Sequence, residues 1–351
     1  MSVEVLSFGC RLNAHESEAM RGLAERAGHR GPVVLVNTCA VTAEAEKQAR
    51  KAIRAAHRRN PDAPILVTGC ASQIAPGAWA ALPGVARVVP NPDKLRPEAW
   101  APEASLPPAA DALPPGAAVG SDRARTRAFV QVQGGCDHAC TFCVIPQGRG
   151  PSFSVPLATL AEKVRALVEQ GHREAVLTGV DIASYGADLP DRPSLGATVR
   201  RLLALVPELP RLRLSSLDPA ALDGELWRLL AEEPRLMPHL HLSLQHGADL
   251  VLKRMRRRHR RADALSAARR ARDARPDIAL GADLIAGFPT ETDAHHRETL
   301  DLTEEMGLSF LHVFPYSERP GTPAARMPPV PLPLRRERAA RLREAGAAAA
   351  A

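Results

Sequence analysis

The sequence contains no long hydrophobic run. No apolar stretch approaches the roughly 20 residues that span a membrane, and the opening Met1-Ser2-Val3-Glu4 lacks the basic residues and long apolar segment of a secretory signal. These absences argue against an integral membrane protein and against export. We therefore expect a cytoplasmic protein of 351 residues with no membrane partner, long enough for two domains.

Aromatic residues are scarce, at 3% of the chain. Few side chains are therefore available for base stacking, and phosphate charge would carry most of any RNA affinity. The net charge is +7, and residues 253–275 alone hold eleven basic and two acidic side chains, a local charge of +9. Nucleic acid is the expected partner, with a solvated, arginine-rich helix as the alternative.

Cysteine is present in small number, and its placement is the most informative feature of the chain. The six cysteines form two sets of three, which suits metal ligation better than disulfides in a reducing compartment. Cys136, Cys140 and Cys143 have the spacing C-x3-C-x2-C, which can hold a 4Fe-4S cluster with one iron open for a cofactor. Zinc or an electron-transfer cluster is the alternative, with His138 as the nearest fourth zinc ligand.

The other three cysteines each follow a short apolar run that indicates a buried parallel strand. These runs are residues 3–8, 33–37 and 65–68. Cys10, Cys39 and Cys70 come just after them, with Gly9 and Gly69 beside two of the three. Because parallel strands end at one edge of a sheet, we expect the three thiols to meet there as metal ligands. Buried structural cysteines are the alternative.

The remaining pattern predicts α/β organisation in two domains. Thr42, followed by Glu44 and Glu46, predicts a helix start within an N-terminal domain of residues 1–95. Residues 96–122 are rich in proline and alanine and indicate a linker without secondary structure. After it, six strands alternate with helices and predict a parallel sheet, doubly wound or curved into an incomplete barrel. The expected strands cover residues 129–132, 175–178, 211–215, 239–244, 278–284 and 310–313.

Several motifs together resemble a known family. Residues 133–136 and 148–150, with the cysteine loop between them, are similar to the radical S-adenosylmethionine superfamily, and within it to the methylthiotransferases. Gly9-Cys10-Arg11-Leu12-Asn13 and residues 37–42 most resemble the branch that modifies threonylcarbamoyladenosine in tRNA. Residues 281–292 and 312–317 match as well. The resemblance implies an N-terminal methylthiotransferase domain followed, at residues 123–327, by an incomplete (β/α)6 radical SAM barrel.

The resemblance also implies two 4Fe-4S clusters with separate tasks. The open iron above Cys136, Cys140 and Cys143 would bind S-adenosylmethionine, and an electron from a donor such as flavodoxin or ferredoxin would generate a 5'-deoxyadenosyl radical. A radical is needed because no general base usefully deprotonates the adenine C2 position near neutral pH. The second cluster, held by the other three cysteines, would carry the sulfur that is methylated and transferred.

The implied reaction adds a methylthio group to C2 of N6-threonylcarbamoyladenosine next to the tRNA anticodon. We expect the enzyme to be a monomer that binds the anticodon loop. The alternatives are another tRNA adenosine, a ribosomal protein as substrate, or a non-catalytic iron-sulfur protein that carries electrons or binds RNA.

Contacts to S-adenosylmethionine are expected at strand ends. The predicted contacts are Gly179, Asp181, Ser215 and Gln245. The family often uses a Glu after the second strand of the barrel, and this chain has none there. His239 and His241 suggest a metal cluster but are better explained as core or rim residues. His246 stands where the family usually has Ser.

Two further segments bear on RNA binding. Residues 253–261 are expected in the loop after the fourth strand and the opening of the next helix, where one arginine would pair with the carboxylate of S-adenosylmethionine and others with phosphates. Residues 328–351 are expected as a proline-rich segment and a basic helical tail. By the resemblance, a small β-rich RNA-binding domain would follow. We expect it to be missing, through truncation or because the enzyme is naturally short.

Overall fold

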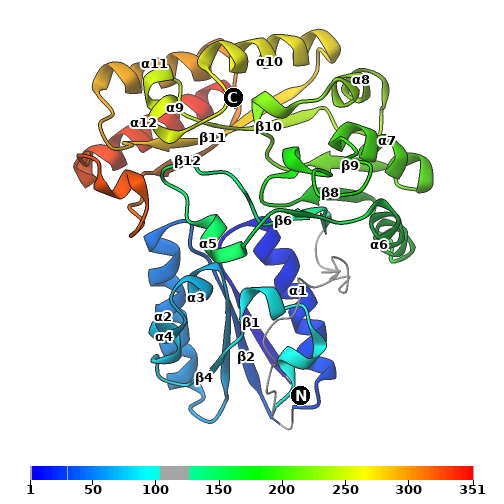
Figure 1. Ribbon diagram of the computed structural model, residues 1–351, viewed down its shortest axis with the longest axis vertical. Helices are drawn as coiled ribbons and strands as arrows, with labels where there is room; N and C mark the ends of the chain where they lie inside the picture. Colours follow the sequence, from blue (N-terminus) through cyan, green and yellow to red (C-terminus); the bar gives the residue numbers. More distant parts are fainter. Residues whose placement is uncertain (1, 30, 103–125, 351) are drawn as a thin grey trace. The chain divides into compact units, whose positions relative to one another are not determined.

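The computed structural model describes residues 2–29, 31–102 and 126–350, and the chain forms two compact units (Figure 1). The first comprises Met1–Asp137 and Val144–His172, and the second comprises His138–Cys143 and Arg173–Ala351. The cysteine loop thus passes from the first unit to the second. The domain boundaries expected from the sequence remain a prediction.

The first unit is built on a four-stranded parallel sheet with the order β1-β2-β3-β4. The strands are β1 (Val3–Ser7), β2 (Val33–Thr38), β3 (Ile65–Gly69) and β4 (Val85–Val88). The first three were expected from their apolar runs. β4 was missed because its four residues, half of them alanine and arginine, give too short an apolar signal.

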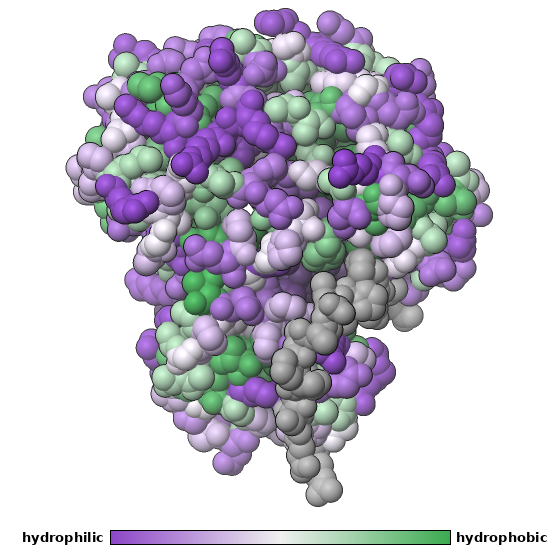
Figure 2. Space-filling model, in the orientation of Figure 1, coloured by the Kyte–Doolittle hydropathy of each residue, from purple (hydrophilic) through white to green (hydrophobic). Residues whose placement is uncertain are grey.

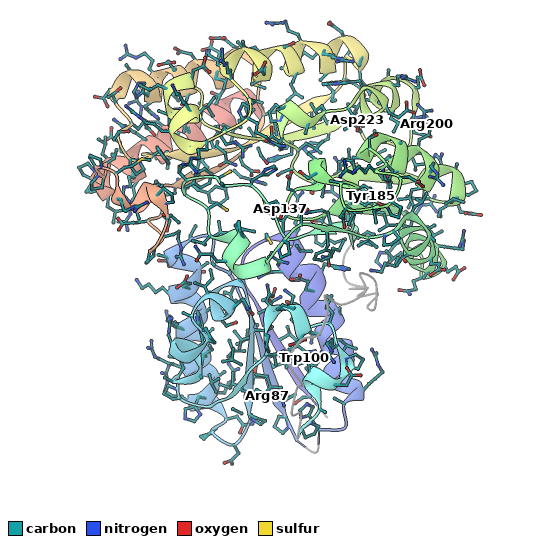
Figure 3. All side chains as sticks on the ribbon, in the orientation of Figure 1. Arg87, Trp100, Asp137, Tyr185, Arg200 and Asp223 are labelled. Carbon is teal, nitrogen blue, oxygen red and sulfur yellow. The ribbon has the colours of Figure 1, made fainter. Side chains whose placement is uncertain are left out.

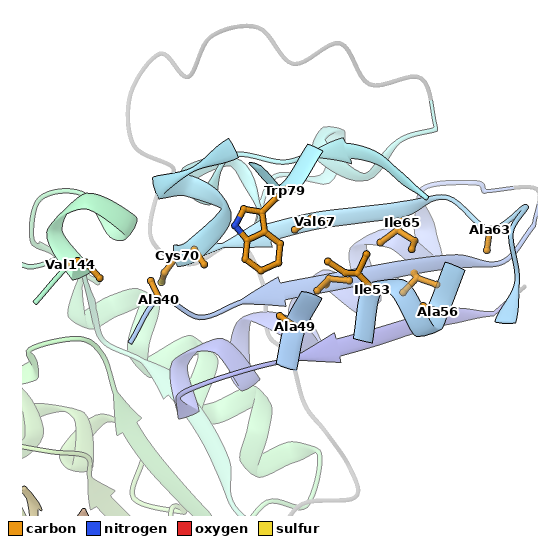
Figure 4. Packing of buried hydrophobic residues seen from close by; sticks show 13 residues of the cluster. Ala40, Ala49, Ile53, Ala56, Ala63, Ile65, Val67, Cys70, Trp79 and Val144 are labelled. Atoms are coloured by element: carbon orange, nitrogen blue, oxygen red, sulfur yellow. The ribbon is translucent and has the colours of Figure 1, made fainter. Parts of the chain in front are cut away.

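Alternate residues of β2 serve two cores on opposite faces of this sheet. Val34 and Val36 pack with Ile53 of α2 (Ala43–Arg59), in a cluster that also holds Trp79 and Cys70 (Figure 4). Val33 and Leu35 pack instead with α1 (Arg11–Arg26) and Trp100. The helix start expected at Thr42 is confirmed, since its side chain accepts a hydrogen bond from the backbone N–H of Ala45 at 3.1 Å.

The beginning of the expected linker differs from the prediction. The segment after β4 forms two 3-10 helices, η1 (Asn91–Asp93) and η2 (Pro97–Trp100). Trp100 is fully buried, and its indole N–H donates to the Lys94 carbonyl at 2.9 Å. Arg87, near Trp100 in Figure 3, donates to the carbonyls of Ala99 and Ala101 at 2.8 and 3.1 Å. Proline at the first helical turn and a large apolar side chain favour local structure here. Residues 103–122 of the expected linker lie outside the described residues.

Short elements complete the first unit. They are α3 (Cys70–Ile74), α4 (Pro76–Ala80), β5 (Ala128–Gln131), β6 (Gln133–Gly134), α5 (Ile145–Arg149), β7 (Phe153–Ser154) and α6 (Leu157–Glu169). β5 is the first of the six strands expected for the barrel.

The second unit contains the other five expected strands, all in parallel pairings. They are β8 (Glu174–Thr178), β9 (Arg211–Leu214), β10 (His239–Gln245), β11 (Ala279–Ala286) and β12 (Phe310–Pro315). β8 pairs with β9, and β10 and β12 flank β11, while Leu217 bridges to Leu242 of β10. The carboxyl ends of these strands thus lie at one rim.

Helices and short 3-10 turns connect these strands and follow them. They are η3 (Ile182–Ser184), α7 (Leu195–Leu205), η4 (Pro219–Ala221), α8 (Gly224–Glu232), α9 (Asp249–Met255), α10 (Arg261–Ala274), α11 (Asp293–Glu305), η5 (Pro323–Arg326) and α12 (Leu332–Ala350). Within residues 2–29, 31–102 and 126–350, no helix combines the length and apolar character needed to cross a membrane.

The helix expected within residues 328–351 is present as α12, which belongs to the second unit. It packs against β11, β12 and α11. Its Arg338 is buried and contacts Glu291 at 3.1 Å and Asp293 at 2.6 Å. Arg335 donates to the carbonyls of Val330 and Tyr316 at 2.6 and 3.1 Å. The sequence showed basic residues, but only the packed helix shows that these two face inward.

Candidate functional site

Three cysteines follow three successive strands of the first unit. Cys10 caps the start of α1, Cys39 follows β2, and Cys70 opens α3 directly after β3. Gly9 has φ of +98°, and a Cβ on it would lie 2.5 Å from the Cys39 sulfur. Only glycine therefore lets the loop that carries Cys10 approach Cys39 this closely.

Asn13 joins two of these strand-end loops. Its side-chain amide donates to the carbonyl of Phe8 at 2.8 Å and to that of Thr38 at 3.0 Å. The residues that precede Cys10 and Cys39 are thereby tied to the first turn of α1. Asn13 stood in the motif that carried the family resemblance, although the sequence did not indicate this bridging role.

The three thiols share one electrostatic environment. Burial, with a smaller contribution from negative charge on Cys10 and Cys70, raises the pKa of the Cys39 thiol to about 12. Cys39 and Cys70 are buried, whereas Cys10 is exposed. Three soft sulfur donors converge here from separate strands, and a metal would have to displace the Cys39 proton to bind. This donor set fits an iron-sulfur cluster held by three thiolates.

The second cysteine set lies on the loop between β6 and α5. In the first unit, the backbone N–H of Cys136 donates to the carbonyl of Gly150 at 3.1 Å. In the second, Thr141 donates through its N–H to Met255 at 3.2 Å and through its hydroxyl to the Arg254 carbonyl at 2.8 Å. The part of the loop that carries Cys140 and Cys143 is therefore fixed against the end of α9.

A hollow of about 100 Å³ adjoins Cys140 within the second unit. It is lined by His138, Ala139, Cys140, Asp218, Arg256, Arg257 and Arg258. Arg257 donates to the Cys140 sulfur at 3.7 Å, to Asp218 at 3.2 Å and to the Ser243 carbonyl at 2.7 Å. Burial would raise the pKa of Asp218, but the ring of His259, 3.7 Å away, and the charges of Arg257 and Arg258 hold that pKa well below its usual range.

Asp181, which the sequence predicted at the cofactor, contacts the cysteine loop. His138 Nε2 lies 2.6 Å from its carboxylate, and the Ser184 hydroxyl donates to the same oxygen. His138 was considered above as a zinc ligand, and here its ring instead pairs with a carboxylate from the turn after β8. Sequence spacing could not reveal this pair, because 43 positions separate the two residues.

The other predicted cofactor residues stand at strand ends of the second unit. Gly179 follows β8, Ser215 follows β9, and Gln245 ends β10. Gln245 has φ of +69°, and the register of β10 against β11 shifts between Leu242 and Gln245. A non-glycine residue in this conformation is uncommon and is typical of a functional rim.

The basic run was expected in the loop after β10 and the opening of the next helix. In the structure a short helix, α9, comes between, so the run begins in the last turn of α9 and ends at the start of α10. Lys253 and Arg254 belong to the last turn of α9, and Arg261 opens α10. Arg254 donates to the Thr290 hydroxyl at 2.8 Å, and Arg261 pairs with Glu305 at 2.6 Å. Hydrophilic side chains gather over the face where α9 and α10 lie (Figure 2). Four cations of the run are exposed: Lys253, Arg256, Arg258 and Arg260.

The histidines of β10 were expected to be core or rim residues, and His241 fits this expectation. His241 is buried in the sheet and lies 3.1 Å from the carboxylate of Asp283, which His312 also contacts at 3.1 Å. His246 is buried against Glu291 at 3.2 Å. These pairs belong to the interior and the rim of the second unit.

Comparison with known proteins decides the family. A radical SAM superfamily model matches residues 130–303, and a model described as uncharacterized protein family UPF0004 matches residues 2–89. A threonylcarbamoyladenosine tRNA methylthiotransferase (MtaB) of Rickettsia prowazekii is 48% identical over 98% of this chain and 82% of its own length. The chain belongs to the radical SAM methylthiotransferase family. The MtaB of Thermotoga maritima is 36% identical over 93% of this chain and 77% of its own length.

Solved structures support the fold of this methylthiotransferase. The radical S-adenosylmethionine methyltransferase TsrM of Kitasatospora setae superposes with a TM-score of 0.60 at 19% identity, over 90% of this chain and 68% of that one. The S-adenosylmethionine radical enzyme OxsB gives 0.60 at 11% identity, over 97% and 55%. The expected fold class, a parallel α/β domain followed by a radical SAM barrel fold, is confirmed.

Sequence reasoning on this methylthiotransferase missed one buried ionic group near Cys10 and Cys70. Glu16 of α1 lies 2.6 Å from Lys94 and 2.8 Å from Arg149. Arg149 stood in the quoted Gly148-Arg149-Gly150 stretch, but Glu16 and Lys94 carried no local signal. Their positions in the chain are too far apart for any motif.

Proposed function

We propose that this chain is a tRNA methylthiotransferase that adds a methylthio group to C2 of N6-threonylcarbamoyladenosine next to the anticodon. The observation that carries this proposal is the 48% identity with a threonylcarbamoyladenosine tRNA methylthiotransferase over 98% of the chain. tRNA-2-methylthio-N(6)-dimethylallyladenosine synthases, such as that of Sorangium cellulosum, match at 35%. The difference favours the threonylcarbamoyl nucleoside as substrate.

Both cysteine sets are proposed as ligands of 4Fe-4S clusters. Cys136, Cys140 and Cys143 would hold the cluster of the radical SAM fold, and the cysteines at the ends of β1, β2 and β3 would hold an auxiliary one. When bound, the clusters and S-adenosylmethionine supply a carbon radical that removes the C2 hydrogen, and a sulfur atom for methylation and insertion.

The residues of the second unit orient the cofactor. The carboxylate of Asp181, held by His138, is proposed to accept a hydrogen bond from the amino group of S-adenosylmethionine, together with Gly179, Ser215 and Gln245 at neighbouring strand ends. Arg258 is the candidate partner of the cofactor's carboxylate, since it lines the hollow beside Cys140 and its side chain is 41% exposed. Arg257 pairs with Asp218 as Arg258 does, but only 9% of its side chain is exposed and it also donates to the Cys140 sulfur, so it is less accessible to a cofactor.

The exposed cations after β10 are proposed to contact phosphates of the anticodon loop. Each phosphate contact releases counterions, so binding should weaken with salt. Replacing Lys253, Arg256 and Arg260 together by glutamine should lower the slope of log K against log salt concentration by about 1 per lost contact. The matched control replaces Arg211, Arg228 and Arg297 elsewhere in the second unit. An equal loss of slope in both variants would remove the proposed interface.

A flavodoxin or ferredoxin as electron donor, a monomeric state and a cytoplasmic location stay predictions. The decisive test of function is mass spectrometry of tRNA nucleosides from cells with and without the gene. Complementation with wild type should restore the 2-methylthio derivative of threonylcarbamoyladenosine, and complementation with the Cys10→Ala variant should not. An unchanged nucleoside profile on deletion would end the proposal. Iron analysis should give roughly eight irons per reconstituted chain and roughly four in Cys10→Ala.

A further inference from the structure

A buried ion-pair network lies in the first unit beside the auxiliary cysteines. Both terminal guanidinium nitrogens of Arg149 donate to the Glu16 carboxylate, at 2.8 and 2.9 Å, and Lys94 donates to the same carboxylate at 2.6 Å. The side chains of Arg149, Lys94 and Glu16 are 6%, 4% and 2% exposed. Water therefore contributes little to the solvation of these three charges.

The positive and negative charges of this buried network are unequal. With Lys94 protonated, Arg149 and Lys94 bring two positive charges and Glu16 brings one negative charge, a net charge of +1, and the lowering of the Lys94 pKa by burial reflects the cost of this excess. An uncompensated buried charge is costly, because neither water nor a counterion offsets it. An additional anion is therefore expected within reach of this network.

Arg149 is directed toward the auxiliary cysteines. The side-chain oxygen of Asn13 accepts from Arg149 at 2.6 Å and lies 3.9 Å from the Cys10 sulfur, so guanidinium and thiol share one acceptor. On the other side, a Cβ added to Gly148 would lie 2.9 Å from the Cβ of Cys70. The turn that ends in Arg149 thus packs directly on Cys70.

Electrostatics agrees with this placement. Burial would lower the pKa of Arg149, but the charges of Cys70, Glu16 and Cys10 raise it well above its ordinary value. The guanidinium therefore stays charged and is stabilised by negative charge on two of the three cysteines. A 4Fe-4S cube with two positive charges and three thiolates carries one negative charge, which equals the excess of the network.

We propose that Arg149 is a positioning residue that neutralises the auxiliary cluster and raises its reduction potential. The inference rests on the proposed ligation of that cluster by Cys10, Cys39 and Cys70. Reduction adds one negative charge to the cluster, so a fixed neighbouring cation stabilises the reduced form more than the oxidised form. Glu16, which also accepts a hydrogen bond from Lys94, holds the guanidinium in place, and burial separates the guanidinium from water.

The test is a redox titration of the auxiliary cluster in the full reconstituted chain. The cysteines at 136, 140 and 143 are replaced by alanine, so that the electron paramagnetic resonance signal comes from the auxiliary cluster alone. Dithionite serves as the reductant. Arg149→Met leaves Glu16 and Lys94 as a balanced pair and is expected to fold. At a fixed potential, it should lower the ratio of reduced to oxidised cluster at least tenfold, which is 59 mV for one electron.

Matched variants separate charge from shape. Arg149→Lys keeps the charge and should retain most of the wild-type potential, and Arg21→Met, which removes a surface arginine of the same unit, should leave it unchanged. Loss of iron in Arg149→Met but not in Arg149→Lys, with unchanged circular dichroism, also supports the proposal. The proposal is overturned if the reduction potential is unchanged in Arg149→Met, or if Arg149→Met and Arg149→Lys lower the potential, or lose iron, to the same extent. If the wild-type background holds no cluster, the proposed ligation itself fails.

Discussion

Glu16→Gln is the substitution for which the structure makes the sharpest stability prediction. The variant keeps the size of the side chain but leaves Arg149 and Lys94 buried without their carboxylate. Removing one partner of a buried ion pair costs about 3–5 kcal/mol, because the remaining charge cannot return to water. In a unit of this size each kcal/mol lowers the melting temperature by roughly 2–4 °C. We therefore expect a fall of about 10 °C for the first unit.

The three tryptophans allow each unit to be followed separately. Trp79 and Trp100 are fully buried in the first unit, while Trp227 lies in the second. In a Trp227→Phe background, fluorescence during urea unfolding therefore reports the first unit alone. Wild type and variant are compared at equal iron content, so that cluster loss does not enter the difference.

The matched control is Glu18→Gln in the same helix. Glu18 pairs with Arg21 at 3.4 Å near the surface, where such pairs contribute about 0–1 kcal/mol. The two substitutions are chemically identical, so their difference isolates the burial of Glu16. If Glu16→Gln destabilises the first unit no more than Glu18→Gln does, the argument from buried charge is wrong.

Three other predictions follow from named contacts. Burial would raise the pKa of Glu16, but its cationic partners lower this pKa from 4.5 to about 2. The ionised carboxylate therefore contributes about 3 kcal/mol to the free energy of unfolding above pH 4.5, and this contribution disappears as the pH falls toward 2. Urea titrations should show this loss in wild type but not in Glu16→Gln. Gly148→Ala should displace α5 from α3 and lower auxiliary iron content, whereas Gly77→Ala, which meets no atom within 4 Å, should not. Arg338→Met leaves Glu291 without its buried cation and should cost the second unit about 3 kcal/mol, read from the urea midpoint; an unchanged midpoint would show that α12 does not hold this unit.

Local sequence signals determined the elements that carry the chemistry. Short apolar runs predicted β1, β2 and β3. The strands β2 and β3 are buried along their whole length, as such a run implies, whereas β1 lies at the edge of the sheet and carries the exposed Ser7. Thr42 predicted its helix start, since a hydroxyl at that position satisfies an otherwise unpaired backbone N–H. The six expected strands of the barrel are all present in the structure.

Prediction from the sequence failed where local secondary-structure propensity was weak or where tertiary packing overrode that propensity. Proline and alanine suggested an unstructured linker at Pro97–Trp100, yet burial of Trp100 stabilises a 3-10 helix there. The basic residues at 328–351 predicted a basic helical tail but not its packing, and in α12 the buried Arg338 pairs with Glu291. In both cases, partners far away in the chain decide the structure, and no local window contains them.

The sequence by itself determined the cysteine spacing, the order of strands and helices, and the motifs that mark the family. Only the tertiary structure placed Glu16, Lys94 and Arg149 in one buried group beside Cys10 and Cys70, and paired Asp181 with His138. The physical reason is that covalent order sets local backbone preferences. Charge balance in a low dielectric depends instead on contacts between residues as many as 133 positions apart.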